Sequence, residues 1–161
     1  MTVELADAAI HQVEPAYRSA LRVHAAIFWI PAFIGALVAD RFLLAETPIG
    51  GLAPVLAAAI GLSAVIIAPD RIYRRLGYAI DGRILRTVRG WLFHTDTIVP
   101  FVRVQHIDVT RGPVEKLFGI ASLVVHTAGT HNSIVTLPGL SPSRAAEIRE
   151  AIRVMIRADA E

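Results

Sequence analysis

The stretch IGGLAPVLAAAIGLSAVIIA, which occupies Ile49–Ala68, contains twenty consecutive residues without a charge. At about 1.5 Å of rise per residue, a helix of this length spans roughly 30 Å, the thickness of the hydrocarbon core of a bilayer. A helix of a soluble protein seldom runs so far without a single charged side chain. The stretch therefore predicts a transmembrane helix.

A shorter apolar segment, Ala25–Ala39, precedes this helix and has fifteen uncharged residues. It reaches a full span only if it continues through Asp40 and Arg41 to Leu44. Two adjacent opposite charges near a helix end can pair or extend to the membrane surface, so this continuation is acceptable. We expect a second transmembrane helix here, packed antiparallel to the first, with glycine and alanine allowing the backbones to approach closely.

A cleaved signal peptide is the alternative interpretation of the first apolar segment. Signal peptides begin with a short basic leader. Here the residues before the segment include the acidic Glu4, Asp7 and Glu14. This composition favours a helix that stays in the protein as an anchor.

The apolar excess of the chain is confined to one region. Of its 161 residues, 54% are hydrophobic and 19% are charged, whereas soluble domains carry about 25% charged residues. We predict three parts: a cytoplasmic N-terminal segment 1–23, a two-helix transmembrane hairpin 24–69, and a soluble-looking domain 70–161. The chain has no cysteine, which excludes disulfides, thiolate metal sites and cysteine nucleophiles.

The flanking charges predict the orientation. Basic residues concentrate on the cytoplasmic side of membrane helices. The loop between the two helices offers only Arg41, whereas arginines lie on the outer flanks of both helices: Arg18, Arg22, Arg71, Arg74 and Arg75. We therefore expect a multi-pass protein of the plasma membrane with both termini in the cytoplasm.

Residues 70–161 show short β-prone runs separated by turn signals such as Asp81-Gly82. The expected strands are Leu76–Ile80, Ile84–Val88, Trp91–Val99, Val102–Thr110, Ile120–His126 and Ser133–Leu137, with an irregular connection or helical turn at Val114–Gly119 and a turn at Ala128–Asn132.

The domain is expected to end in one amphipathic helix, from about Pro142 to Arg157. Ser141 stands at the N-cap position and Pro142 at the first helical position. Apolar residues then recur at helical spacing and must be buried against a neighbour. Six or seven antiparallel strands followed by one helix favour an α+β pleckstrin-homology-like domain, a bent β barrel or sandwich capped by the helix. Another small α+β fold remains the alternative on pattern alone.

The segment PFVRVQHIDVTRGPVEKLFGIASLVVHTAG, Pro100 to Gly129, resembles the bacterial pleckstrin-homology-like family of YdbS-like membrane proteins. The similarity rests on Pro100, Arg103, Gln105-His106, Gly112-Pro113, Lys116, Leu117-Phe118-Gly119, Thr127-Ala128-Gly129 and Pro138-Gly139-Leu140. The resemblance covers about His24 to Ile156, including the two apolar segments.

This resemblance implies a cytoplasmic β domain held by two membrane helices. It implies that the partner is a larger relative with several copies of the same domain, and it brings no catalytic residues. A homo-oligomer is the other expected partner. The implied role is a membrane complex serving envelope maintenance or stress resistance.

Gln105, His106 and Asp108 form the most chemically suggestive motif. His106 and Asp108 share one face of a strand, where they could exchange a proton, bind a partner or help to bind a metal. A metal site needs three or four ligands, and the sequence shows no other cluster at compatible spacing. We expect a structural or partner-binding polar site formed by Arg103, Gln105, His106 and Asp108.

Other histidines have simpler interpretations. His126 and His131 flank a turn and are expected to face each other across a hairpin, where paired histidines can bind a metal or sense pH. Polar residues on a solvated hairpin are the commoner case, and the same applies to His94 with Asp96. We expect no metal and no cofactor.

Six arginines follow the second helix within twenty residues: Arg71, Arg74, Arg75, Arg83, Arg86 and Arg89. They set the orientation, and they are also candidates for contact with anionic lipid, at about 1 kcal/mol per charge near the surface. No nucleic-acid motif accompanies them.

The leading hypothesis is a non-enzymatic, membrane-anchored interaction or scaffold module. An anionic-lipid headgroup sensor that uses the arginines is the alternative. An enzyme with a site around His106 and Asp108 is a third.

Overall fold

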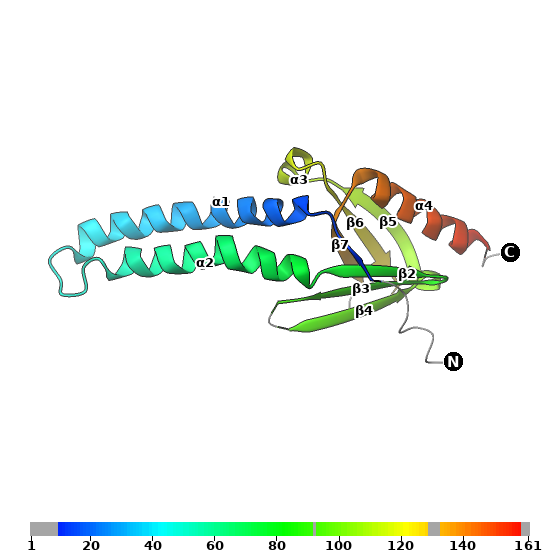
Figure 1. Ribbon diagram of the computed structural model, residues 1–161, viewed down its shortest axis with the longest axis horizontal. Coiled ribbons are helices and arrows are strands. Elements are labelled where there is room, and N and C mark those ends of the chain that lie inside the picture. Colours follow the sequence, from blue (N-terminus) through cyan, green and yellow to red (C-terminus); the bar gives the residue numbers. More distant parts are fainter. Residues whose placement is uncertain (1–9, 92, 129–132, 159–161) are drawn as a thin grey trace. The chain divides into compact units, whose positions relative to one another are not determined.

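The computed structural model describes residues 10–91, 93–128 and 133–158 of the chain. It divides into two compact units, Arg18–Arg71 on the one hand and Met1–Tyr17 together with Ile72–Glu161 on the other. Figure 1 shows a pair of long helices in the first unit and strands with shorter helices in the second.

The first unit is an antiparallel helical hairpin. Its elements are α1 (Ala16–Ala39), a π-helical turn η2 (Asp40–Leu44) and α2 (Leu52–Arg74). Pro54 lies in the first turn of α2, where a missing backbone N–H costs nothing. Gly51 precedes this helix at a φ of 83° and donates its backbone N–H to the Asp40 carboxylate at 2.8 Å. Asp40, one of the two charges inside the expected first span, therefore closes the turn between the helices.

The apolar side chains of these helices are largely uncovered by protein. Both helices are long and apolar enough to cross a membrane, as predicted from the uncharged stretches. The exposed large apolar residues of the hairpin are Ile27, Phe28, Ile30, Ile34, Leu37, Val38, Phe42, Leu43, Leu52, Val55, Leu56, Ile60, Leu62, Ile66 and Ile67. A patch of this size in water is expensive, so the pattern indicates lipid as its surroundings.

Polar and steric contacts join the two helices. Near the start of α1 and the end of α2, Asp70 accepts a hydrogen bond from Arg22 at 3.1 Å and pairs with Arg18 at 3.5 Å. Towards the middle, a Cβ on Gly61 would lie 3.3 Å from the Cβ of Trp29. The expected close approach through small residues is found at Gly61, whereas Gly35 faces open space.

The second unit contains two antiparallel sheets. The first has the order β1-β2-β3-β4 and the second β5-β6-β7. The strands are β1 (His11–Gln12), β2 (Gly77–Asp81), β3 (Ile84–Gly90), β4 (His94–Pro100), β5 (Val104–Thr110), β6 (Ala121–Thr127) and β7 (Ile134–Leu140); the helices are η3 (Phe101–Arg103), α3 (Pro113–Leu117) and α4 (Pro142–Ala158).

Both sheets and α4 share one core. Leu85 of the first sheet, Leu123 of the second and Ile152 of α4 are fully buried members of the same cluster. Ser141 caps α4 as predicted, because its hydroxyl accepts the backbone N–H of Arg144 at 3.3 Å. The expected pleckstrin-homology-like order of strands and final helix is confirmed, but the described strands form two hydrogen-bonded sheets and not a closed barrel.

Several strand boundaries differ from the predictions. The third predicted strand begins at His94 and not at Trp91. The chain turns tightly between Gly90 and Phe93, so tightly that a Cβ on Gly90 would collide with the backbone carbonyl of Phe93. The fourth begins at Val104, after the 3-10 turn η3. The last strand continues through Pro138-Gly139 to Leu140, three residues beyond its predicted end at Leu137. The two-residue β1, which no pattern predicted, pairs with β2. The predicted turn Ala128–Asn132 lies mostly outside the described residues.

Gly139 offers a sharp test of the packing at the end of β7. Its φ is 76°, and an added Cβ would lie 2.7 Å from the ring of Tyr17, so Gly139→Ala combines backbone strain with a steric clash. We expect the variant to lose at least about 2 kcal/mol of unfolding free energy, measured by denaturant unfolding of the protein in detergent.

Gly82→Ala is the matched control for this substitution. Gly82 also has a positive φ, 47°, but open space surrounds its Cβ position. It should lose only about 1 kcal/mol. Equal losses at the two positions would show that contact with Tyr17 does not matter.

Candidate functional site

The strongest candidate site is a groove of about 530 Å³ between strand β5 and helix α4. Strand β5 lies at the edge of its three-stranded sheet, so one side of its backbone has no strand partner among the described residues. Both elements belong to the second unit. The residues that line the groove are Val104, Gln105, His106 and Ile107 from β5, and Arg149, Arg153, Ile156 and Arg157 from α4.

A β-bulge shapes the strand side of the groove. The pairing of β5 with β6 shifts register between Val104 and His106, which leaves Gln105 without a partner residue. In a regular strand, neighbouring side chains point to opposite faces. A bulge breaks this alternation and bends the strand. The bulge therefore places the exposed Gln105 and His106 next to each other at the groove, whereas Val104 and Ile107, which also border the groove, pack against the core.

Three arginines give the helix side of the groove its charge. Arg149, Arg153 and Arg157 recur every fourth residue and so lie along one face of α4. Arg153 has Glu150 at 3.6 Å, whereas Arg149 and Arg157 make no ion pair or hydrogen bond with the described residues. The opposite face of α4, with Ala145, Ile148 and Ile152, is buried in the core. The groove thus offers two guanidinium groups that no carboxylate of the described residues neutralises.

The predicted polar motif lies beside this groove. The Nε2 atom of His106 is 2.8 Å from one carboxylate oxygen of Asp108, and the Nε2 atom of His126 is 3.5 Å from the other. His106 and His126 are direct cross-strand partners, with ring centroids 5.9 Å apart. Sequence reasoning linked His106 to Asp108 but assigned His126 to His131, which lies outside the described residues. Within the described chain, no set of three or more His, Cys, Asp or Glu side chains is arranged to hold a metal ion.

Arg103, the remaining member of the predicted polar site, lies apart from the groove. It belongs to η3, its side chain is exposed, and its backbone carbonyl accepts the N–H of Ala128 at 2.8 Å. The structure therefore brings Gln105, His106 and Asp108 together and leaves Arg103 at the adjoining turn.

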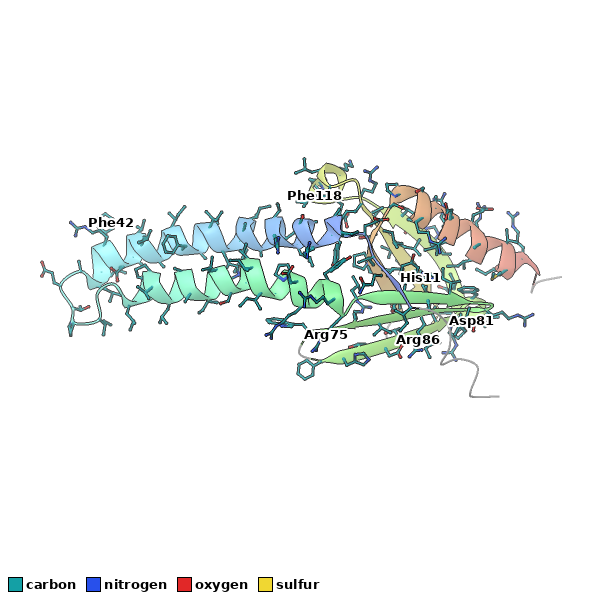
Figure 2. All side chains as sticks on the ribbon, viewed as in Figure 1. His11, Phe42, Arg75, Asp81, Arg86 and Phe118 are labelled. Atoms are coloured by element: carbon teal, nitrogen blue, oxygen red, sulfur yellow. The ribbon has the colours of Figure 1, made fainter. Side chains whose placement is uncertain are left out.

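The six juxtamembrane arginines do not form one surface. Arg86 on β3 donates from Nε to both carboxylate oxygens of Asp96 on β4, at 3.1 and 3.0 Å. This ion pair lowers the pKa of Asp96, chiefly through the hydrogen bond from Arg86. Arg83 lies in the β2–β3 turn, at the end of the sheet opposite Arg75, and Figure 2 shows the neighbouring Asp81 far from Arg75 along the strands.

The arginines nearest the membrane helix have different partners. Arg75 donates from Nη1 to the backbone carbonyl of Trp91 at 3.0 Å. Arg74 is the last residue of α2, and Arg89 lies near the end of β3. Arg71 belongs to the helical unit. Arg74, Arg75 and Arg89 are therefore the exposed cations that the second unit places closest to its connection with α2.

The Arg86–Asp96 pair predicts a dependence of stability on pH. Because the folded pKa of Asp96 is lowered, the pair stabilises the fold above the unfolded pKa of an aspartate, about 3.9, and this contribution is lost as the pH falls through the folded value. We expect Asp96→Asn to lower the midpoint of thermal unfolding at pH 7 and to reduce the further drop between pH 5 and pH 2.

Asp81→Asn is the control, since Asp81 is an exposed turn residue and forms no ion pair among the described contacts. Circular dichroism of both variants, each against the parent protein at each pH, measures the difference. A parallel pH response of Asp96→Asn and the parent would contradict the prediction.

Comparison with known proteins gives two matches. The family model described as "Bacterial PH domain" matches residues 25–156. The "UPF0699 transmembrane protein YdbS" of Bacillus subtilis (strain 168) is 32% identical over 93 residues, which cover 58% of this chain and 57% of the relative. The match thus spans little more than half of that protein. No solved structure matches the chain.

Proposed function

The chain belongs to the family of bacterial PH domains, and we propose that it is a membrane-anchored interaction module whose groove between β5 and α4 binds an extended segment of a protein partner. The family and the two apolar helices place it among PH-like membrane proteins, which are not an enzyme class. A non-catalytic role follows from this proposal.

The groove is the observation that carries the proposal. An edge strand beside a helix can accept an added strand, with main-chain hydrogen bonds giving affinity and the flanking side chains giving selectivity. Here Arg149 and Arg157 lack carboxylate partners among the described residues, so the preferred segment is acidic. We propose a larger relative with several PH-like domains as the partner, with a second copy of this chain as the rival, in a complex that serves envelope maintenance or stress resistance.

The pairing of β1 with β2 supports the proposed topology. His11 and Gln12 precede the two apolar helices, and their partners Tyr78 and Gly77 follow them. Two segments can pair in one sheet only on the same side of the membrane. Together with the arginines that flank the hairpin, this favours a cytoplasmic domain and a cytoplasmic N-terminal segment.

Site-specific photo-crosslinking in cells tests the groove. A photoreactive amino acid at Gln105, on the strand side of the groove, should yield one defined adduct in the membrane fraction. Adding Arg149→Glu and Arg157→Glu should reduce this adduct severalfold, because a basic groove becomes acidic.

The matched control places the same amino acid at Val154, which is exposed on α4 outside the groove. It should give no such adduct. An adduct that persists after both charge reversals, or that forms equally at Val154, would remove the groove from the proposal. The mass of the adduct separates a second copy of the chain from another protein.

Binding of anionic lipid headgroups is the second candidate function. Arg74 and Arg75 border a hollow of about 440 Å³ together with His94, close to the end of α2. Cations at this position meet the lipid surface and attract anionic headgroups. Arg86 contributes little to such a site, because Asp96 already neutralises it.

Hydrogen exchange in bilayers of different charge tests this candidate. In vesicles that contain phosphatidylglycerol, the backbone near Arg74 and Arg75 should exchange more slowly than in phosphatidylcholine alone. Arg74→Glu with Arg75→Glu should abolish the difference, whereas Arg83→Glu, at the far turn of the same sheet, should preserve it. If the parent protein exchanged at the same rate near Arg74 and Arg75 in both kinds of vesicle, headgroup sensing would be excluded.

A further inference from the structure

The connection between β3 and β4 presents two exposed aromatic side chains. Trp91 is 43% exposed and Phe93 is 83% exposed. Both follow Gly90, the last residue of β3, where an added Cβ would collide with the carbonyl of Phe93. The tight turn therefore holds the aromatic residues at the end of the sheet and out of its core. Neither residue contributes to the groove or to the polar motif beside it.

A hydrogen bond ties this turn to the chain where it leaves α2. Arg75 follows the last residue of that helix and donates to the carbonyl of Trp91 at 3.0 Å. Both residues belong to the second unit, so the tie holds however that unit is oriented relative to the helical hairpin. Wherever the membrane places the Arg75 guanidinium group, it also places the backbone of Trp91 within hydrogen-bond distance.

The position of Arg75 relative to the bilayer follows from the helix length. The uncharged stretch ends at Ala68 and α2 continues to Arg74, so Arg75 lies roughly 10 Å beyond the apolar stretch. The headgroup layer on each side of the hydrocarbon core is about 5–8 Å thick. Arg75 therefore lies just outside this layer, close enough for the side chains of the turn bonded to it to reach the headgroups.

The chemistry of the turn suits this position. Tryptophan and phenylalanine place apolar rings among lipid headgroups, and tryptophan in particular concentrates at the membrane–water interface. The flanking charges are Arg74, Arg75 and Arg89, with His94 beside them. The nearest carboxylate on the same strands, Asp96, is occupied by Arg86. Among the residues that the structure describes, no carboxylate pairs with Arg74, Arg75 or Arg89. A basic rim around exposed rings is typical of surfaces that lie on lipid.

We propose that Trp91 and Phe93 form a membrane-insertion site, through which the domain docks on the bilayer that its own helices cross. The ligand is the interfacial layer of the bilayer. Insertion depends on the aromatic rings and needs no anionic headgroup, which separates it from headgroup sensing. It is also independent of the proposed groove, which lies between different elements of the same unit.

Fluorescence quenching by brominated lipid tests the insertion. The chain has two tryptophans, so Trp29→Phe leaves Trp91 as the sole emitter. The full chain is reconstituted in phosphatidylcholine vesicles, with or without bromine at shallow acyl positions. We expect a blue-shifted emission that loses intensity in brominated vesicles and resists quenching by aqueous acrylamide. Adding Phe93→Ser should reduce the loss of Trp91 emission intensity that brominated lipid causes.

A relocated tryptophan is the control. In the background Trp29→Phe with Trp91→Phe, Val154→Trp places the sole emitter on α4, where Val154 is 58% exposed. The emission intensity of this tryptophan should be the same with and without brominated lipid. Emission of Trp91 that is unaffected by bromine would overturn the proposal, whether water or another protein surrounds the ring. Equal quenching at position 154 would overturn it as well, because the turn would then have no special contact with lipid.

Discussion

Apolar side chains without protein cover must find another nonpolar environment, and this requirement governs the molecule. The two long helices leave their large aliphatic residues exposed over most of their length, and a bilayer is the solvent that makes this favourable. Because α2 runs from the uncharged stretch to Arg74 without interruption, the β domain begins within a few residues of the lipid. Any partner of the β domain must therefore reach it close to that surface.

The elements that were predictable from sequence are those with strong local signals. Twenty uncharged residues determined α2, the Asp81-Gly82 turn placed β2 against β3, and Ser141-Pro142 marked the start of α4. Alternation along β5 also placed His106 and Asp108 on one face. In each case the decisive residues are near neighbours in the chain, so the relevant physics is local and the pattern reveals it.

The features that escaped prediction depend on contacts between distant residues. Strand β1 has only two residues and exists because β2 offers it an edge. Gln105 and His106 are both exposed at the groove because of a register shift against β6, which no spacing in β5 predicts. His126 meets His106 through that same pairing. The arginines after α2 look equivalent in sequence, yet Asp96 neutralises one of them from the adjacent strand.

The short strand β1 has a consequence for how the protein is assembled. Gln12 and Gly77 are sixty-five positions apart, and closing so long a loop of flexible chain for two residues of pairing would be entropically unfavourable. Once both helices are inserted side by side, their ends lie only about 10 Å apart, and the effective concentration of β1 beside β2 becomes high. Bilayer insertion thus acts as a folding template for the sheet, and its first strand can be added only after the second helix has returned to the side on which the chain began.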